Sequence, residues 1–134
     1  MPGDFVDLIA WQEAVALAGE VARLARKLRG PGALAVADQM RRAAESVPAN
    51  IAEGYGRYTG RDFARFLRVA AASAAELESH LRVAVITERL EAPVVDPVVA
   101  RCRRVRALIR GLRKAVEART SAAPSRIDLQ VVRP

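Results

Sequence analysis

The sequence predicts an all-α protein folded as an antiparallel up-down-up-down four-helix bundle. In four separate segments, apolar residues recur at steps of three and four, which is typical of amphipathic helices. The connections between these segments are short, so consecutive helices should be antiparallel neighbours. Aromatic residues are only 4% of the chain, and alanine is the commonest apolar residue. This composition favours close helix–helix packing over a sheet sandwich.

The first helix is expected over about residues 8–29. Its apolar stripe widens toward the C-terminal half and begins with Leu8, Trp11 and Val15. Asp7 is placed to cap its first turn. The Gly-Pro-Gly sequence of residues 30–32 should end it with a short turn.

The second helix is expected over residues 33–53. Its apolar stripe consists of Val36, Met40, Ala43, Ala44, Val47 and Ile51. Pro48 lies within that stripe and removes a backbone hydrogen bond, so the helix should kink or locally unwind there. Gly54 and Gly56 should then end it, because glycine accepts the left-handed conformation that often follows a helix.

The third helix is expected over residues 60–89, with Thr59 as its cap and Asp62 in its first turn. Its apolar residues follow a strict 4-3 repeat, which predicts a bundle seam with a crossing angle near +20°. The repeat consists of Phe63, Leu67, Ala70, Ala74, Leu77, Leu81 and Ala84.

The fourth helix is expected over residues 96–119, with Asp96 as its cap and Pro97 as its first residue. Its seam consists of Val95, Val98, Cys102, Val105, Ile109, Leu112 and Val116. Residues 1–120 therefore form one domain. In the remaining tail, 121–134, a disordered segment is favoured over a strand, although Ile127, Leu129 and Val131 alternate with polar residues.

The sequence favours a cytoplasmic location. No run approaches the roughly 20 apolar residues of a membrane span, and the segment before the first helix lacks the basic region of a signal peptide. The single cysteine, Cys102, cannot form an internal disulfide, which fits a reducing compartment.

The positive charge is concentrated in the last third of the chain. The formal net charge is +7. Residues 1–60 hold seven basic and seven acidic side chains, residues 61–95 hold five of each, and residues 96–134 hold ten basic and three acidic. Such an excess is costly in self-repulsion unless an anionic partner screens it. Nucleic acid, or else an acidic protein, is therefore the expected partner.

The candidate nucleic-acid-binding residues lie beside the seam of the fourth helix. They are Arg103, Arg106, Arg110, Arg113 and Lys114. No aromatic residue is interleaved with them, so phosphate contacts without base readout are expected. Arg61, Arg65 and Arg68 form a second stripe on the third helix, where a solvated face is the favoured interpretation because charge is balanced there.

The sequence offers little for catalysis, and we expect a protein that is not an enzyme and has no metal or cofactor. One histidine, His80, and one cysteine cannot complete an ordinary zinc site. The Glu-x-x-His pairs of di-iron bundles are absent. An acid–base role for Glu45, Asn50 and Glu53 is possible in principle, but helix termination and subunit contacts are favoured for them.

The stretch RRAAESVPANIAEGYGR, residues 41–57, resembles the proteins encoded in intervening sequences of bacterial 23S rRNA genes. The resemblance covers about residues 5–90. It includes Leu8, Trp11, Gln12 and Ala14 in the first helix. In the third helix it includes Phe63, Phe66, Leu67, Ala70, Ser73, Glu76, Leu77, Glu78 and Leu81.

This resemblance implies a four-helix bundle that assembles as a homopentamer and has no known enzymatic activity. The fold also resembles the accessory protein of diversity-generating retroelements, which engages a reverse transcriptase and nucleic acid. An adaptor or accessory factor with an acidic protein partner is therefore the alternative function. The motif residues expected near a subunit interface are Arg41, Arg42, Ser46, Pro48, Asn50, Glu53, Gly54, Gly56 and Arg57.

Overall fold

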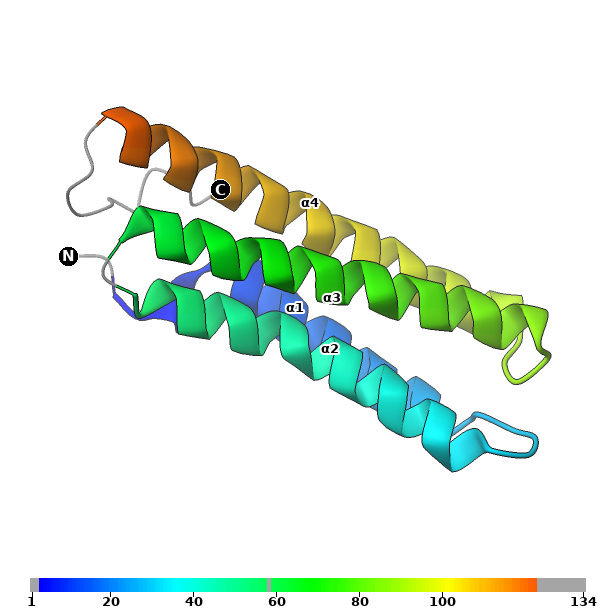
Figure 1. Cartoon of the computed structure of the whole chain (residues 1–134). Helices are drawn as coiled ribbons and strands as arrows, with labels where there is room; N and C mark the ends of the chain where they lie inside the picture. The colour runs from blue at the N-terminus through cyan, green and yellow to red at the C-terminus, as the bar shows by residue number, and fades with distance from the viewer. Residues whose placement is uncertain (1–2, 58, 123–134) are drawn as a thin grey trace.

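The computed structural model describes residues 3–57 and 59–122, which form a short 3-10 turn and four long helices (Figure 1). The turn η1 spans Phe5–Asp7, and the helices are α1 (Ile9–Ala25), α2 (Ala33–Tyr55), α3 (Gly60–Ile86) and α4 (Ala92–Ala122). No strand occurs in the described part of the chain. The predicted all-α class is confirmed.

Consecutive helices run antiparallel, as Figure 1 shows. α1 packs against α2 and α4, and α3 packs against the same two helices. This is the predicted up-down-up-down bundle.

The core lies where the four predicted apolar seams meet. Its largest fully buried side chains come from every helix and include Leu17, Met40, Ile51, Leu67, Leu77, Leu81 and Ile109. Ala14, Ala44, Ala70 and Ala74 are also completely buried. These short side chains allow the helix backbones to approach closely.

The first helix begins without the predicted Asp7 cap. Asp7 instead accepts a hydrogen bond from the Asp4 amide at 3.1 Å, and Leu8 precedes α1 with no side-chain cap. The Asp4 and Asp7 carboxylates thus close the η1 turn. That turn brings Phe5 edge-to-face against Trp11, with ring centroids 5.3 Å apart.

Two helices end earlier than predicted, because their terminal turns bond to each other. α1 ends at Ala25 instead of residue 29, and α3 ends at Ile86 instead of residue 89. The Arg29 amide donates to the Arg89 carbonyl at 3.2 Å, and the Arg89 guanidinium donates back to the Arg29 carbonyl at 3.2 Å. These bonds join the turn after α1 to the turn after α3.

The second helix differs from prediction at Pro48, Gly54 and Gly56. It is continuous through Pro48, so no local unwinding occurs there. Its neighbours Val47 and Ile51 are completely buried, and their packing offsets the lost backbone bond. Gly54 lies inside the helix, and Gly56 follows its end in a right-handed conformation with φ −78°. The predicted left-handed glycine end is therefore wrong.

The third helix begins as predicted, whereas the fourth does not. Thr59 Oγ1 accepts a hydrogen bond from the Asp62 amide at 3.1 Å, which confirms the cap of α3. α4 begins at Ala92, so Asp96 and Pro97 lie within it and not at its start. The early start places Val95 in the core. α4 also continues to Ala122, and the rest of the predicted tail lies outside the described residues.

Candidate nucleic-acid interface

A shallow groove of about 280 Å³ lies between α3 and α4, and we call it the basic groove. Three alanines of α3 and Ile109 of α4 form its apolar part, and four arginines surround them. The lining residues are Arg68, Ala71, Ala72, Ala75, Arg106, Ile109, Arg110 and Arg113. The groove therefore combines guanidinium groups from two helices.

Two of the four groove arginines have no ionic partner among the described residues. Arg110 and Arg113 make no hydrogen bond or ion pair with any described residue. Arg68 is paired with Glu117 across the α3–α4 contact, and Arg106 is paired with Glu78. The groove consequently keeps a positive charge that the described residues do not neutralise.

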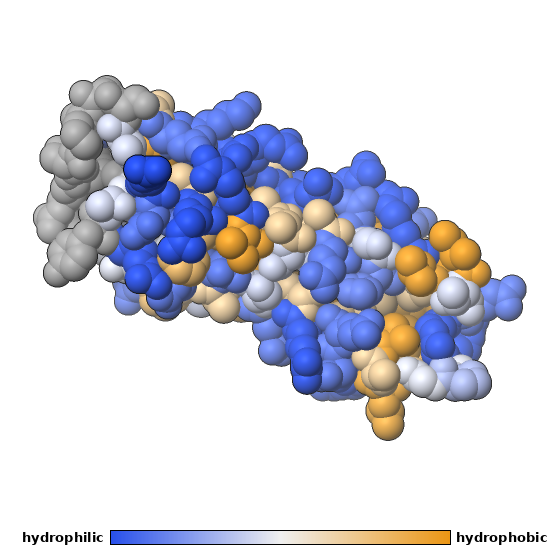
Figure 2. Space-filling view, in the orientation of Figure 1, coloured by the Kyte–Doolittle hydropathy of each residue, from blue (hydrophilic) through white to orange (hydrophobic). Residues whose placement is uncertain are grey.

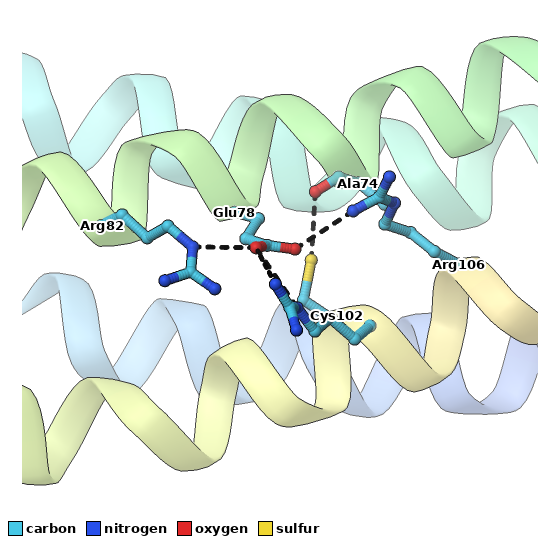
Figure 3. Close-up of polar contacts among 6 residues, drawn as sticks. Ala74, Glu78, Arg82, Cys102 and Arg106 are labelled. Atoms are coloured by element: carbon cyan, nitrogen blue, oxygen red, sulfur yellow. Dashed lines mark hydrogen bonds and ion pairs between the residues drawn. The ribbon is translucent and has the colours of Figure 1, made fainter.

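Glu78 of α3 lies at the centre of an arginine cluster next to this groove (Figure 3). Its side chain is only 10% exposed. It accepts hydrogen bonds from Arg82 Nε at 2.8 Å, from Arg103 Nη2 at 3.3 Å and from Arg106 Nη1 at 3.1 Å. A single carboxylate thus orients three arginines from two helices.

The ionisation of Glu78 depends on these arginines. Burial alone raises the pKa of its carboxyl, but the hydrogen bonds and positive charges of Arg82 and Arg103 outweigh burial and bring the pKa below 4.5. Glu78 is therefore ionised at neutral pH.

Cys102 faces the same cluster from α4 and is completely buried. Its thiol donates a hydrogen bond to the Ala74 carbonyl at 3.0 Å (Figure 3). Burial, together with the negative charge of Glu78, raises the pKa of the thiol to about 11. The thiol is consequently protonated at neutral pH, and Cys102 is a small core residue rather than a nucleophile.

On the opposite side of α4, arginines form ion pairs with glutamates of α1. Glu13 accepts from Arg101 Nη1 at 3.0 Å and from Arg104 Nε at 3.1 Å. Arg101 also pairs with Glu20. The charge of this side of α4 is thus largely neutralised within the chain.

The structure divides the predicted binding residues into two groups. Glu78 binds Arg103 and Arg106, whereas Arg110 and Arg113 line the groove without an ion pair to residues 3–57 or 59–122. Lys114 is exposed and lies outside the groove lining. The five residues therefore share one helix but not one environment.

The end of the predicted interface motif packs against α3 within the same chain. A Cβ atom on Gly54 would lie 2.7 Å from Phe66 Cβ and 2.9 Å from Phe63 Cδ1. The guanidinium groups of Arg57 and Arg65 lie 4.7 Å and 4.6 Å from the centroid of the Phe66 ring. Gly54 is therefore needed for the close contact between α2 and α3.

Earlier motif residues form a polar contact midway along the same two helices. The hydroxyl groups of Ser46 and Ser73 lie 2.8 Å apart, and Asn50 Nδ2 donates to the Ser46 carbonyl at 2.8 Å. The other polar motif residues lie toward the surface. Arg42 pairs with Asp38, Glu53 pairs with Arg57, and Arg41 is half-buried without an ion pair to any described residue.

Comparison with known proteins supports both the family that the motif of residues 41–57 suggests and the four-helix fold. A sequence model of the 23S rRNA-intervening sequence protein family matches residues 6–111, which is well over half of the chain. The chain belongs to this family. The match continues beyond the predicted limit of residue 90, and thus reaches the groove residues of α4 as far as Arg110.

A solved structure places this family member on a known fold. The crystal structure of a protein of unknown function from the S23 ribosomal protein family of Bacteroides thetaiotaomicron is 20% identical, with a TM-score of 0.71. The alignment covers 79% of this chain and 99% of that protein. At this identity the likeness supports the fold alone. A search of curated proteins found no match.

The described residues of this family member include neither a membrane-spanning helix nor a cluster of metal ligands. None of its described helices is long and apolar enough to cross a membrane. No group of three or more potential metal ligands occurs in residues 3–57 and 59–122. His80 Nε2 lies 3.3 Å from Glu76 Oε2, and the two residues form an exposed pair one helical turn apart.

Two residues that the sequence pattern did not single out lie at or beside the basic groove of this family member. Arg68 was interpreted as part of a solvated stripe, yet it lines the basic groove opposite the arginines of α4. Glu78 was recognised only as part of the family pattern. An acidic residue on an apolar seam is the one sequence signal that points to it, because a buried carboxylate requires basic partners.

Proposed function

We propose that this protein is a non-enzymatic nucleic-acid-binding protein and that the basic groove is its contact surface. The observation that supports the proposal most directly is the convergence of four arginines from α3 and α4 on one shallow groove. Arginine binds phosphate through planar, bidentate hydrogen bonds, and it remains charged at all physiological pH values.

Arg110 and Arg113 make no ion pair with the residues that the structure describes, so a ligand that contacts them breaks no ion pair within that part of the chain. Arg68 and Arg106 lie beside them but are partly neutralised by Glu117 and Glu78. A phosphate is therefore expected to contact Arg110 and Arg113 first. The Ala and Ile lining offers no hydrogen-bond donor for reading bases, so affinity should be insensitive to sequence.

The proposal assigns no catalytic step. The thiol of Cys102 is buried and its pKa is raised to about 11. His80 and Glu76 form an exposed pair away from the groove lining. None of these groups faces the groove in a position to act on a bound phosphodiester.

The proposal includes a closed homo-oligomer, with a homopentamer as the form that the family resemblance implies. Large apolar side chains remain exposed on α2 and α3, namely Leu34, Val69, Val83 and Ile86. Figure 2 shows apolar groups on the face that these helices present. In a ring the basic groove would be repeated by symmetry, and multivalency would strengthen weak binding at each site.

Light scattering coupled to size exclusion tests the assembly independently of binding. The expected result is about five times the chain mass of 14.5 kDa. A monomer at micromolar concentration contradicts the oligomer but leaves the groove proposal in place.

Fluorescence anisotropy with labelled RNA and DNA over a salt series tests nucleic-acid binding. The double variant Arg110→Gln/Arg113→Gln should weaken binding to all sequences alike and reduce the salt slope by roughly 1.4 to 1.8, at about 0.7 to 0.9 per phosphate contact. Arg23→Gln/Arg26→Gln removes the same charge from the C-terminal end of α1 and is the matched control. These two arginines also lack an ion pair with any described residue.

The outcomes separate nucleic acid from the alternative partner. Equal losses in both double variants would mean that net charge matters and that the groove does not. If the wild-type protein shows no salt-dependent binding to any nucleic acid, the proposal is wrong. An adaptor or accessory role with an acidic protein partner then becomes the better hypothesis.

A further inference from the structure

The shape of the basic groove bears on the kind of nucleic acid that it fits. It lies between two neighbouring helices, whose axes in packed bundles are about 8–10 Å apart. Its volume is about 280 Å³, and Ala71, Ala72 and Ala75 lie along its α3 side. The short alanine side chains leave room for a recess between the two helices.

Arginines stand on both sides of this recess. Arg68 belongs to α3, whereas Arg106, Arg110 and Arg113 belong to α4. A single sugar–phosphate strand lying in the groove is therefore within reach of guanidinium groups from two directions. A duplex is much wider than the recess, since its major groove alone measures about 12 Å across. It would rest on the outer arginines without entering.

The three arginines of α4 also set the length of strand that fits. Arg106 and Arg113 are seven residues apart, which is about 10 Å along a helix at 1.5 Å per residue. Within B-DNA each strand carries one phosphate per about 3.4 Å of helix axis, and at that spacing this length corresponds to roughly three phosphates.

We infer that the basic groove binds a single strand of RNA or DNA in preference to a duplex, with the sugar–phosphate backbone against the alanines and the bases facing outward. The inference rests on the proposed function. None of the described residues that line the groove is aromatic, so the strand is held by charge and by apolar contact with its sugars. In this respect it differs from single-strand sites that stack bases on aromatic side chains.

The first test compares ligands on the full-length protein. The probes are a labelled oligo-U, a labelled oligo-dT and a blunt-ended duplex of the same length. At equal salt we expect both single strands to bind at least about tenfold more tightly than the duplex, a difference of about 1.4 kcal/mol. For the single strands, the slope of log K against log salt should be about −2 or steeper, because three phosphate contacts contribute about −0.7 each.

The second test fills the groove. Ala72 is exposed, so Ala72→Leu should obstruct the recess without disturbing the core. It should weaken single-strand binding several-fold and leave duplex binding unchanged. Ala107→Leu adds the same side chain to an exposed position of α4 that does not line the groove, and it should have no effect. Ala72→Glu places a carboxylate among the arginines and should weaken single-strand binding further.

The results distinguish this inference from the proposed function. Equal affinity for duplex and single strand, or wild-type binding by Ala72→Leu, would overturn the single-strand groove while nucleic-acid binding survives. Absence of salt-dependent binding to all three probes would overturn both. Tighter binding of both single strands than of the duplex would support the inference, and the tighter of oligo-U and oligo-dT would then identify the kind of strand.

Discussion

Glu78 and Arg106 are joined across the α3–α4 contact by a hydrogen bond of 3.1 Å between Oε1 and Nη1. The carboxylate is largely buried, whereas the arginine borders the basic groove. The same group that anchors α4 to α3 therefore also determines the position of a proposed ligand-binding side chain. We therefore expect stability and the proposed binding to be coupled at this pair.

Replacing this carboxylate should destabilise the bundle. Glu78→Gln leaves Arg82, Arg103 and Arg106 without their shared anion. Loss of one partner from a buried pair costs about 3–5 kcal/mol, but these arginines are partly exposed, so we expect roughly 1–3 kcal/mol. Urea unfolding followed by circular dichroism measures the loss. Glu76→Gln, two residues away with a side chain 63% exposed, is the control and should change the unfolding free energy by less than about 0.5 kcal/mol.

The Glu78 contribution should depend on pH. The pKa of this carboxyl is lower in the folded protein than its ordinary value of 4.5. The stabilisation is therefore present above that value and is lost as pH falls through the folded-state pKa. The difference in unfolding free energy between the wild type and Glu78→Gln should accordingly be constant near neutral pH and shrink below about pH 4.5. A difference that stays constant throughout the acid range would contradict the assigned ion pairs.

The Cys102 thiol should be inert in the folded protein. It is completely buried, and its pKa is raised from 9.0 to about 11. Labelling with a thiol reagent at mildly alkaline pH should be slow in buffer and fast in urea, so its rate reports unfolding. The raised pKa also has a consequence for stability. The contribution of the neutral thiol is present below pH 9.0 and is lost as pH rises through about 11. Rapid labelling of the native protein would show that Cys102 is accessible.

Two glycines should respond to alanine in opposite directions. At Gly54 a Cβ atom would lie 2.7 Å from Phe66 Cβ, so Gly54→Ala should destabilise the protein by about 1–3 kcal/mol through overpacking. At Gly111, in α4, nothing lies within 4 Å of the added atom. Gly111→Ala should therefore stabilise the protein by up to about 1 kcal/mol, because alanine is the better helix former. Thermal unfolding of both variants measures the contrast, and stabilisation by Gly54→Ala would contradict the observed helix contact.

The sequence by itself determined the all-α class, the order of the four helices, the family and most of the core. Each of these depends on local periodicity or on a continuous motif. The 4-3 repeat of α3 is one example. The apolar residues that make up this repeat, the first of which is Phe63 and the last Ala84, are all buried. The concentration of basic residues in the last third of the chain could also be read directly, because charge is a sum over residues.

Only the tertiary structure decided where the helices end and which arginines form ion pairs with other described residues. α1 and α3 end early because Arg29 and Arg89 exchange hydrogen bonds between two turns that lie 60 residues apart in the chain. Arg103 and Arg110 are both arginines on one helix, yet only Arg103 faces Glu78. Such differences arise from contacts between residues distant in sequence. Periodicity within one helix predicts which face is apolar, but it contains no information on which charges a neighbouring helix places opposite that face.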